Sequence, residues 1–217
     1  MAVVAIVGAG IFGQQIVRMY LDGGAQVEEA VLFDDSVSPG DWNHLCAHSV
    51  YPFARFRDFP RVADCALVGL GYKHLHLRNQ ITAELAVGGV PLPNVVAGSA
   101  IVSADFDSAH RGIVVFPGAV LDSGVSLGRG AVVNAGSVIA HDTTLGDCVF
   151  VGPGATVCGG VTVEREAFIG AGAVVMNGLT IGANSVIAMG SRVQGSTDQG
   201  AQMAGSPARS VSNLRLT

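Results

Sequence analysis

The sequence predicts a two-part protein, a small parallel α/β domain followed by a three-sided parallel β-helix. First, an aliphatic residue recurs at every sixth position through the second half of the chain. Second, the first half opens with an apolar run, a glycine-rich turn and an amphipathic segment. Third, 30 glycines and only 6% aromatic residues suit tight turns around a narrow aliphatic interior. We therefore expect a Rossmann-like sheet and then a solenoid of stacked coils.

Composition excludes several classes of protein. A chain of 217 residues that is 49% hydrophobic and carries a net charge of −5 is not expected to be disordered. No apolar run approaches the ~18 residues of a membrane-spanning helix. Lys73 is the only lysine, so a nucleic-acid surface is not expected. The N-terminus lacks the basic segment of a signal peptide. We expect a cytoplasmic protein with four reduced thiols, because none forms a C-x-x-C pair: Cys46, Cys65, Cys148 and Cys158.

The first domain begins with a strand, a glycine loop and a helix. Residues 3–7 form an apolar run typical of a buried parallel strand, and residues 8–13 match G-x-G-x-x-G before an amphipathic stretch at 14–21. A second run, residues 31–33, ends in two acids about 20 residues beyond the last glycine, which is the dinucleotide-binding context. We expect the glycine loop to bind a phosphate through backbone N–H groups, at Gly8, Gly10 and Gly13. Asp34 or Asp35 would then contact the base or the ribose. A tight turn without a ligand is the open alternative.

The rest of the first half completes a small sheet. Residues 66–71 predict a later strand, and residues 78–86 predict a helix. Lys73 and Arg78 are candidates for contact with a diphosphate. The domain, residues 1–97, is too short for the two mononucleotide-binding halves of a dehydrogenase.

The second domain, residues 98–195, is defined by its hexad repeat, and residues 196–217 are expected to form a cap and tail. Three hexads make one 18-residue coil, so Val133 should stack on Val151. Three positions after each anchor stands a turn-compatible residue, mostly glycine. The anchors are Val115, Leu121, Leu127, Val133, Ile139, Leu145, Val151, Val157, Val163, Ile169, Val175, Ile181, Ile187 and Val193.

The combination of the two halves resembles a known bacterial family. A glycine-loop domain, a hexapeptide solenoid and the closing segment Gly205-Ser206-Pro207-Ala208-Arg209 are together similar to the sialic acid O-acetyltransferases and nucleotide-amino-sugar N-acetyltransferases of surface-glycan synthesis. The most specific stretch is residues 134–142, Asn-Ala-Gly-Ser-Val-Ile-Ala-His-Asp. The resemblance implies a left-handed β-helix, homotrimers, acetyl-CoA as co-substrate in the groove between adjacent solenoids, and no metal.

The resemblance also implies roles for particular residues. His141 matches the general base, Asp142 the acid that supports it, and Gly159, one coil further on, the residue whose backbone amide holds the thioester. Physical reasoning agrees on His141, because a corner residue two places after anchor Ile139 should project outward, and imidazole titrates near neutrality. Asn134 is expected in the acceptor site. The CoA end would be lined by Gly205, Pro207, Ala208 and Arg209, and an ordinary C-terminal lid is the open alternative for these four residues.

The sequence departs from the family pattern at positions near the acceptor. Ile11-Phe12 replaces Gly-His in the glycine loop, and Phe150 replaces a second histidine. Residues 69–73 lack the asparagines of the family segment, and Ala97-Gly98 replaces His-Pro. We expect acetyl transfer from acetyl-CoA to a sugar. N-acetylation of a nucleotide-linked amino sugar is favoured over O-acetylation of a sialic-acid-type acceptor.

Three other functions are open alternatives. A nicotinamide-dependent oxidoreductase would use the glycine loop and Asp34, but it needs a second nucleotide-binding half. A zinc hydratase on the same solenoid needs three histidine ligands, whereas the repeat region has only His110 and His141. The third is a non-catalytic trimeric scaffold or nucleotide-binding protein, which the replacements Phe12 and Phe150 keep open.

Overall fold

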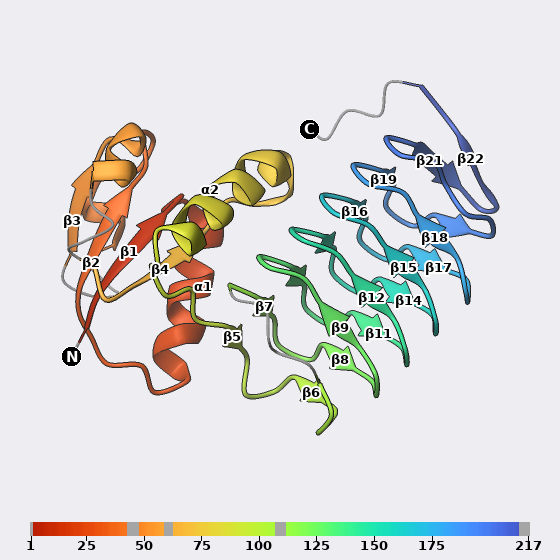
Figure 1. Ribbon diagram of the computed structural model, residues 1–217, viewed down its shortest axis with the longest axis horizontal. Coiled ribbons are helices and arrows are strands. Elements are labelled where there is room, and N and C mark those ends of the chain that lie inside the picture. The colour runs from red at the N-terminus through yellow and green to blue at the C-terminus, as the bar shows by residue number, and fades with distance from the viewer. Residues whose placement is uncertain (1, 43–47, 59–62, 107–111, 213–217) are drawn as a thin grey trace. The chain divides into compact units, whose positions relative to one another are not determined.

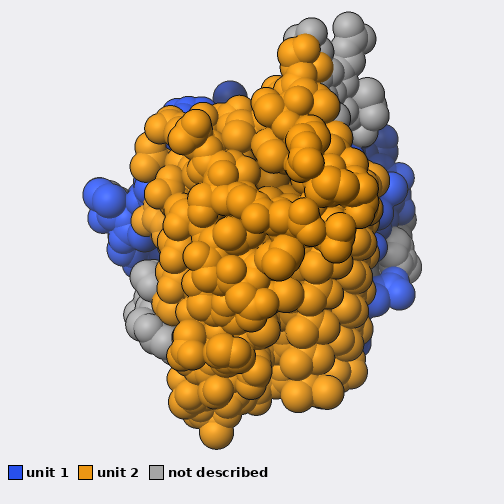
Figure 2. Space-filling model, turned by 90° about the vertical axis from the view of Figure 1, so that its right-hand side faces the viewer, with its two compact units in different colours: residues 1–96 blue, residues 97–217 orange. Residues whose placement is uncertain are grey.

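A computed structural model describes residues 2–42, 48–58, 63–106 and 112–212. The chain divides into two compact units, residues 1–96 and residues 97–217 (Figure 2). No helix in these described ranges is long and apolar enough to span a membrane. Cys65 and Cys148 are buried and Cys158 is partly exposed, and none of the three is in a disulfide. Cys46 lies outside the described residues.

The first unit contains a four-stranded parallel sheet with the strand order β3-β2-β1-β4. Its strands and α-helices are β1 (Ala2–Val7), α1 (Ile11–Asp22), β2 (Val27–Phe33), β3 (His48–Tyr51), β4 (Cys65–Val68) and α2 (Leu75–Val87). Three short 3-10 helices lie between them, at Pro39–Trp42, Phe53–Asp58 and Tyr72–His74. The predicted strands and helices are all present, and β3 is an additional strand at the sheet edge.

One charged residue, Arg78, has a structural role in the interior of this unit. Arg78, a candidate for diphosphate contact, is 1% exposed inside the fold. Its guanidinium donates hydrogen bonds to the carbonyl oxygens of Val68 and Leu70, at the end of β4. Arg78 therefore satisfies backbone acceptors of the sheet and does not face a ligand, which corrects the expectation.

The second unit is a column of short parallel strands that stack coil upon coil (Figure 1). One face carries β7, β10, β13, β16 and β19, the second carries β6, β8, β11, β14, β17 and β20, and the third carries β9, β12, β15 and β18. The strands of this unit are β6 (Ile101–Val102), β7 (Val114–Val115), β8 (Val120–Leu121), β9 (Ser126–Leu127), β10 (Val132–Val133), β11 (Val138–Ile139), β12 (Thr144–Leu145), β13 (Phe150–Val151), β14 (Thr156–Val157), β15 (Thr162–Val163), β16 (Phe168–Ile169), β17 (Val174–Val175), β18 (Thr180–Ile181), β19 (Val186–Ile187), β20 (Arg192–Val193), β21 (Gln202–Gly205) and β22 (Ala208–Ser210). The short strand β5 (Val95–Val96) ends the first unit.

The register confirms the predicted repeat. Val133 pairs with Val151, and Val151 pairs with Ile169, so equivalent residues are 18 apart. Every predicted anchor is at most 1% exposed and lies in the aliphatic interior. The turn glycines have φ near +65 to +71°, and Asp142 takes the same left-handed conformation with φ of 56°. A glycine or an aspartate is well suited to that conformation.

Both ends of the column differ from the regular repeat. In the first coil Ile101 pairs with Val120, so the spacing is 19 residues. The predicted periodicity ends at Val193, yet Thr197 still bridges to Ile181 and β21 still pairs with β19. The antiparallel hairpin of β21 and β22 then closes this end, with Ala208 packed on the column interior.

Candidate functional site

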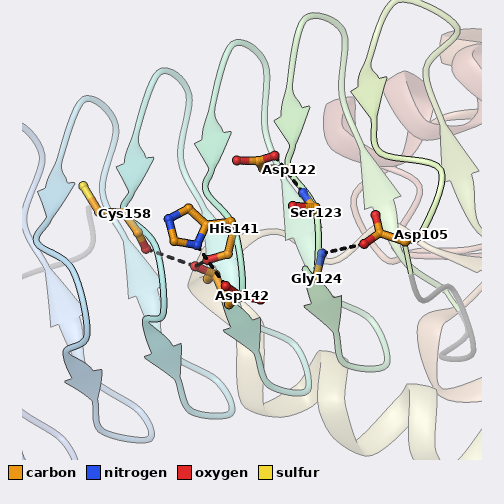
Figure 3. Close-up of polar contacts among 8 residues, drawn as sticks. Asp105, Asp122, Ser123, Gly124, His141, Asp142 and Cys158 are labelled. Atoms are coloured by element: carbon orange, nitrogen blue, oxygen red, sulfur yellow. Dashed lines mark hydrogen bonds and ion pairs between the residues drawn. The ribbon is translucent and has the colours of Figure 1, made fainter.

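The turn between β11 and β12 presents the predicted histidine and acid together. The His141 side chain is 58% exposed and its Nδ1 lies 2.9 Å from Asp142 Oδ2. The left-handed backbone of Asp142 lets adjacent side chains meet at the corner instead of diverging. Figure 3 shows both residues on one turn, with Asp122 on the coil to one side and Cys158 on the coil to the other. The structure therefore brings together the two residues that the sequence singled out.

The electrostatic environment favours protonation of this imidazole. The hydrogen bond to Asp142 raises the pKa of His141 most. Desolvation opposes it, and the charges of Asp142 and Asp122 raise the pKa further, so the net shift is upward. Because the carboxylate engages Nδ1, the neutral ring carries its proton there and leaves Nε2 as the acceptor. His141 can thus remove a proton through Nε2 while Asp142 holds the ring.

Glycines in the neighbouring coils make room for this pair. A β-carbon on Gly159 would lie 2.5 Å from His141 Nε2, and one on Gly124 would lie 2.6 Å from Asp142 Oδ1. Contacts this short are sterically forbidden, so each glycine leaves the space that a ring or carboxylate occupies. The family resemblance pointed to Gly159, one 18-residue coil beyond His141. The same spacing, counted back from Asp142, leads to Gly124, which sequence reasoning missed.

The Gly159 amide is a candidate hydrogen-bond donor. The next amide, that of Gly160, donates to the His141 carbonyl at 2.9 Å. Within the described part of the chain, the Gly159 N–H has no protein acceptor. A backbone donor and a base therefore lie on adjacent coils, which is the pairing that acyl transfer needs.

The remaining donor-side candidates lie elsewhere on the column. They belong to the β21–β22 hairpin, separated from the His141 turn by the coils that carry β14 to β20: Gly205, Pro207, Ala208 and Arg209. Ala208 is 6% exposed, and the Arg209 guanidinium donates to the Ala208 carbonyl at 3.0 Å. Asn134 is partly exposed at the end of β10, where its Oδ1 accepts the Ala135 N–H at 2.8 Å.

The first unit has a cavity of about 400 Å³ at the glycine loop. Its lining includes Gly8, Gly10, Phe12, Asp34, Asp35 and His74. Gly13 is buried in the first turn of α1 and does not line the cavity, and Lys73 is exposed on the 3-10 helix Tyr72–His74. Among the described residues that line this cavity, none is a lysine or an arginine.

The two predicted acids accept hydrogen bonds from the backbone, and Asp34 does so from the glycine loop itself. Asp34 Oδ2 accepts the Ala9 N–H at 2.7 Å, and its Oδ1 accepts the N–H and hydroxyl of Ser36. Burial alone would raise the pKa of Asp34, but the hydrogen bonds from Ser36, Ala9 and Gly10 outweigh it and lower the pKa. Asp35 Oδ1 accepts the Phe53 N–H at 2.9 Å. A carboxylate thus occupies loop amides that a phosphate would otherwise use.

Close packing accounts for two glycines of the first unit. A β-carbon would lie 2.3 Å from the Gly8 carbonyl oxygen at Gly13 and 2.1 Å from it at Gly69. Gly8 has φ of +84°, a left-handed conformation that favours glycine. Gly10 has no such requirement, because a β-carbon there would meet no atom within 4 Å. The tight strand-to-helix turn therefore has a steric reason of its own, independent of any ligand.

Metal chemistry has no evident site in the described residues. They contain no group of three or more histidine, cysteine, aspartate or glutamate side chains that could hold a metal ion. His110, one of the two histidines considered for a zinc site, lies outside the described residues.

Comparisons with solved structures extend over both units. The acetyltransferase domain of PglB from Neisseria gonorrhoeae, in complex with acetyl coenzyme A, superposes with a TM-score of 0.84 at 26% identity over 96% of this chain and 98% of that one. PerB from Caulobacter crescentus, in complex with CoA and GDP-perosamine, gives 0.84 at 27% identity over 97% of each chain. A variant of GDP-perosamine N-acetyl transferase from the same organism gives 0.85 at 25% identity over 98% of each chain.

The family comparison concerns the solenoid. Residues 124–159, 142–177 and 160–195 match the family described as bacterial transferase hexapeptide (six repeats). No curated protein matches the chain. The expected fold, a small parallel α/β sheet followed by a left-handed parallel β-helix, is confirmed. Residues 124–195 therefore carry the hexapeptide repeat of the bacterial transferases, and the chain is similar over both of its units to solved bacterial sugar acetyltransferases.

Proposed function

We propose that this protein transfers the acetyl group of acetyl-CoA to the amine of a nucleotide-linked amino sugar in bacterial surface-glycan synthesis. The observation that carries the proposal is the His141 corner, where an exposed imidazole is oriented by Asp142 above Gly159. Two structural neighbours support the choice of substrates, since one was solved with acetyl coenzyme A and another with CoA and GDP-perosamine.

The chemistry proceeds by direct transfer. His141 Nε2 takes a proton from the acceptor amine as its nitrogen attacks the thioester carbonyl carbon. The tetrahedral oxyanion accepts a hydrogen bond from the Gly159 N–H. Collapse of that intermediate breaks the carbon–sulfur bond, and the departing CoA thiolate takes the proton from the imidazolium. The Asp142 carboxylate stabilises the imidazolium while it exists.

The cavity of the first unit is the candidate site for the nucleotide. Its carboxylates, Asp34 and Asp35, accept hydrogen bonds, and they repel a diphosphate placed directly on the loop. The base and ribose, which offer N–H and O–H donors, suit this lining better than the phosphates do. A cytoplasmic homotrimer that binds acetyl-CoA between adjacent solenoids completes the proposal, as the family resemblance implies.

Release of CoA tests the proposal. The purified protein is mixed with acetyl-CoA and, in separate reactions, with amino sugars linked to uridine, guanosine, thymidine or cytidine nucleotides, or with free sialic acid. A thiol reagent records released CoA, and mass spectrometry records the acetylated product. Turnover with one nucleotide-linked amino sugar is expected. Turnover with sialic acid alone would instead establish O-acetylation.

The opposite results identify the alternatives. No CoA release with any acceptor, together with no CoA binding by calorimetry, would overturn the enzyme and leave a scaffold or nucleotide-binding protein. Tight binding of NADH in a parallel titration would favour the oxidoreductase.

A further inference from the structure

One buried hydroxyl is hydrogen-bonded to the peptide that carries the candidate oxyanion donor. Thr143 is 0% exposed, and its Oγ1 donates to the Cys158 carbonyl at 3.0 Å. The same hydroxyl lies 3.5 Å from the His141 carbonyl. A hydroxyl has one proton to donate. The shorter distance shows that Thr143 donates it to the carbonyl oxygen of Cys158 and not to that of His141.

The geometry of a planar peptide turns this bond into an orienting device. Cys158 C=O and Gly159 N–H belong to one trans peptide unit, in which the C=O and N–H bonds point in opposite directions. Thr143 draws the carbonyl toward the interior of the column, so the N–H must point outward. Hydrogen bonding to the carbonyl also polarises the amide and makes its N–H a better donor.

We propose that Thr143 is a positioning residue for acetyl transfer, which orients and polarises the Gly159 amide as the oxyanion donor. The inference rests on the proposed function and adds a residue that acts only through the backbone. Its hydroxyl is not required by the fold, because Val125 and Val161 occupy the same position in the adjacent coils and are buried equally well.

The chain contains a matched control for this bond. Ser137 is also 0% exposed and donates from Oγ to the Gly152 carbonyl at 2.9 Å. Ser137 holds the same place in its hexad as Thr143, and both hydroxyls reach a carbonyl 15 residues ahead. The residue after Gly152 is Pro153, which has no N–H to orient. Loss of the Ser137 hydroxyl therefore removes a similar hydrogen bond to a carbonyl, but no backbone N–H loses its orientation.

The kinetic test compares Thr143→Val, Thr143→Ser and Ser137→Ala with the natural protein. We expect Thr143→Val to lower kcat about tenfold, less than the 10²–10³-fold of losing an oxyanion donor itself. The KM for acetyl-CoA and the pH at which activity rises should stay unchanged, because His141 is untouched. Thr143→Ser should restore the rate, and Ser137→Ala should match the natural protein in rate.

A spectroscopic test observes the peptide directly. Cys158-Gly159 is the single Cys–Gly pair in the sequence, so protein labelled with ¹³C at cysteine carbonyls and ¹⁵N at glycine gives one carbonyl–amide correlation. That carbonyl resonance should move upfield in Thr143→Val, return in Thr143→Ser, and stay in place in Ser137→Ala.

The outcomes separate this inference from the proposed function. A natural protein that releases CoA, with a Thr143→Val variant equally fast, would overturn the role of Thr143 alone. An unmoved carbonyl resonance in Thr143→Val would do the same by showing that the bond is absent. A natural protein that releases no CoA overturns the proposed function, and the catalytic role of Thr143 falls with it. Equal loss of rate in Ser137→Ala would reduce Thr143 to a merely structural residue.

Discussion

The imidazole of His141 lies within 2.5 Å of the point where a β-carbon on Gly159 would stand, although the two residues are 18 positions apart in the sequence. Residue 159 has no side chain, and the ring fills the space that one would need. The position of the base therefore depends on the absence of a β-carbon in the next coil.

Gly159→Ala tests that dependence. A methyl group would come within 2.5 Å of Nε2 and must push the ring aside. We expect kcat to fall about 10²-fold, the order of loss for a misplaced reacting group, while the melting temperature changes little. Gly195→Ala is the matched control, because Gly195 holds the same place after its anchor and has nothing within 4 Å. Equal rates in both variants would show that the ring need not lie where it does.

His141→Ala removes the base without disturbing the column. Loss of a general base typically lowers the rate by roughly 10²–10⁴-fold, and we expect kcat to fall in that range. Acetyl-CoA affinity, measured by calorimetry, should hardly change. Ser123→Ala, at the same turn position one coil away, serves as the control and should retain full activity. A fully active His141→Ala protein would remove this residue from the mechanism.

The pH dependence of kcat should report the His141–Asp142 pair. Asp142 stabilises the imidazolium and so raises the pKa of His141. The base must be neutral to act, so activity rises with pH through that pKa. Asp142→Asn removes the stabilisation, lowers the pKa and shifts the acidic limb of the profile to lower pH. Asp122→Asn, which removes a weaker influence, should shift it less. A shift to higher pH would contradict the assignment.

The glycine loop gives a pH-dependent prediction about stability. Hydrogen bonds lower the pKa of Asp34 in the folded protein. Its carboxylate therefore stabilises the fold above its unfolded-state pKa of about 3.9, and this contribution is lost as pH falls through the lower folded value. The gap in unfolding free energy between the natural protein and Asp34→Asn should be full near neutral pH and close in acid. Urea unfolding at several pH values measures this difference in unfolding free energy. A difference that does not change with pH would contradict the role given to the Asp34 carboxylate.

The aliphatic column gives a prediction that concerns packing alone. Ile169 is 0% exposed, so Ile169→Ala leaves a cavity and should cost about 2–5 kcal/mol of unfolding free energy. Met189 is 65% exposed, and Met189→Ala should stay within about 0.5 kcal/mol of the natural protein. Urea denaturation compares the two. Similar losses in both variants would mean that the column is not the main core of this unit.

The sequence revealed the solenoid because its period is purely local. Each anchor, such as Val133 or Ile169, repeats a spacing that needs no knowledge of distant contacts. The ends escaped prediction for the converse reason. Thr197 continues the stacking although it is polar, and Met203 stacks on Ile187 at a spacing of 16 residues. The edge strand β3 has only half-buried residues, so its apolar pattern is weak.

The His141 corner was easier to predict than the contacts of Asp34, because only the corner lies in a regular repeat. The roles of His141 and Gly159 came from the family resemblance, and the repeat then fixes the coil and the corner on which each residue lies. The spacing that suggested a ribose contact for Asp34 could not reveal that its carboxylate turns back to the Ala9 amide. That bond depends on how closely the ends of β1 and β2 approach in the folded sheet. Thr143 escaped notice because its hydroxyl partner is a main-chain atom, invisible in any motif.

Because each coil is hydrogen-bonded only to its neighbours, the column can change length without redesign. Duplication of an 18-residue segment beyond residue 160 would add one coil and leave every contact between residues 124 and 160 intact. A six-residue duplication would instead rotate all later faces by one side of the triangle. Insertion of a whole coil would thus keep the His141 corner and its neighbouring coils intact, while it moves the β21–β22 hairpin one coil further from that corner.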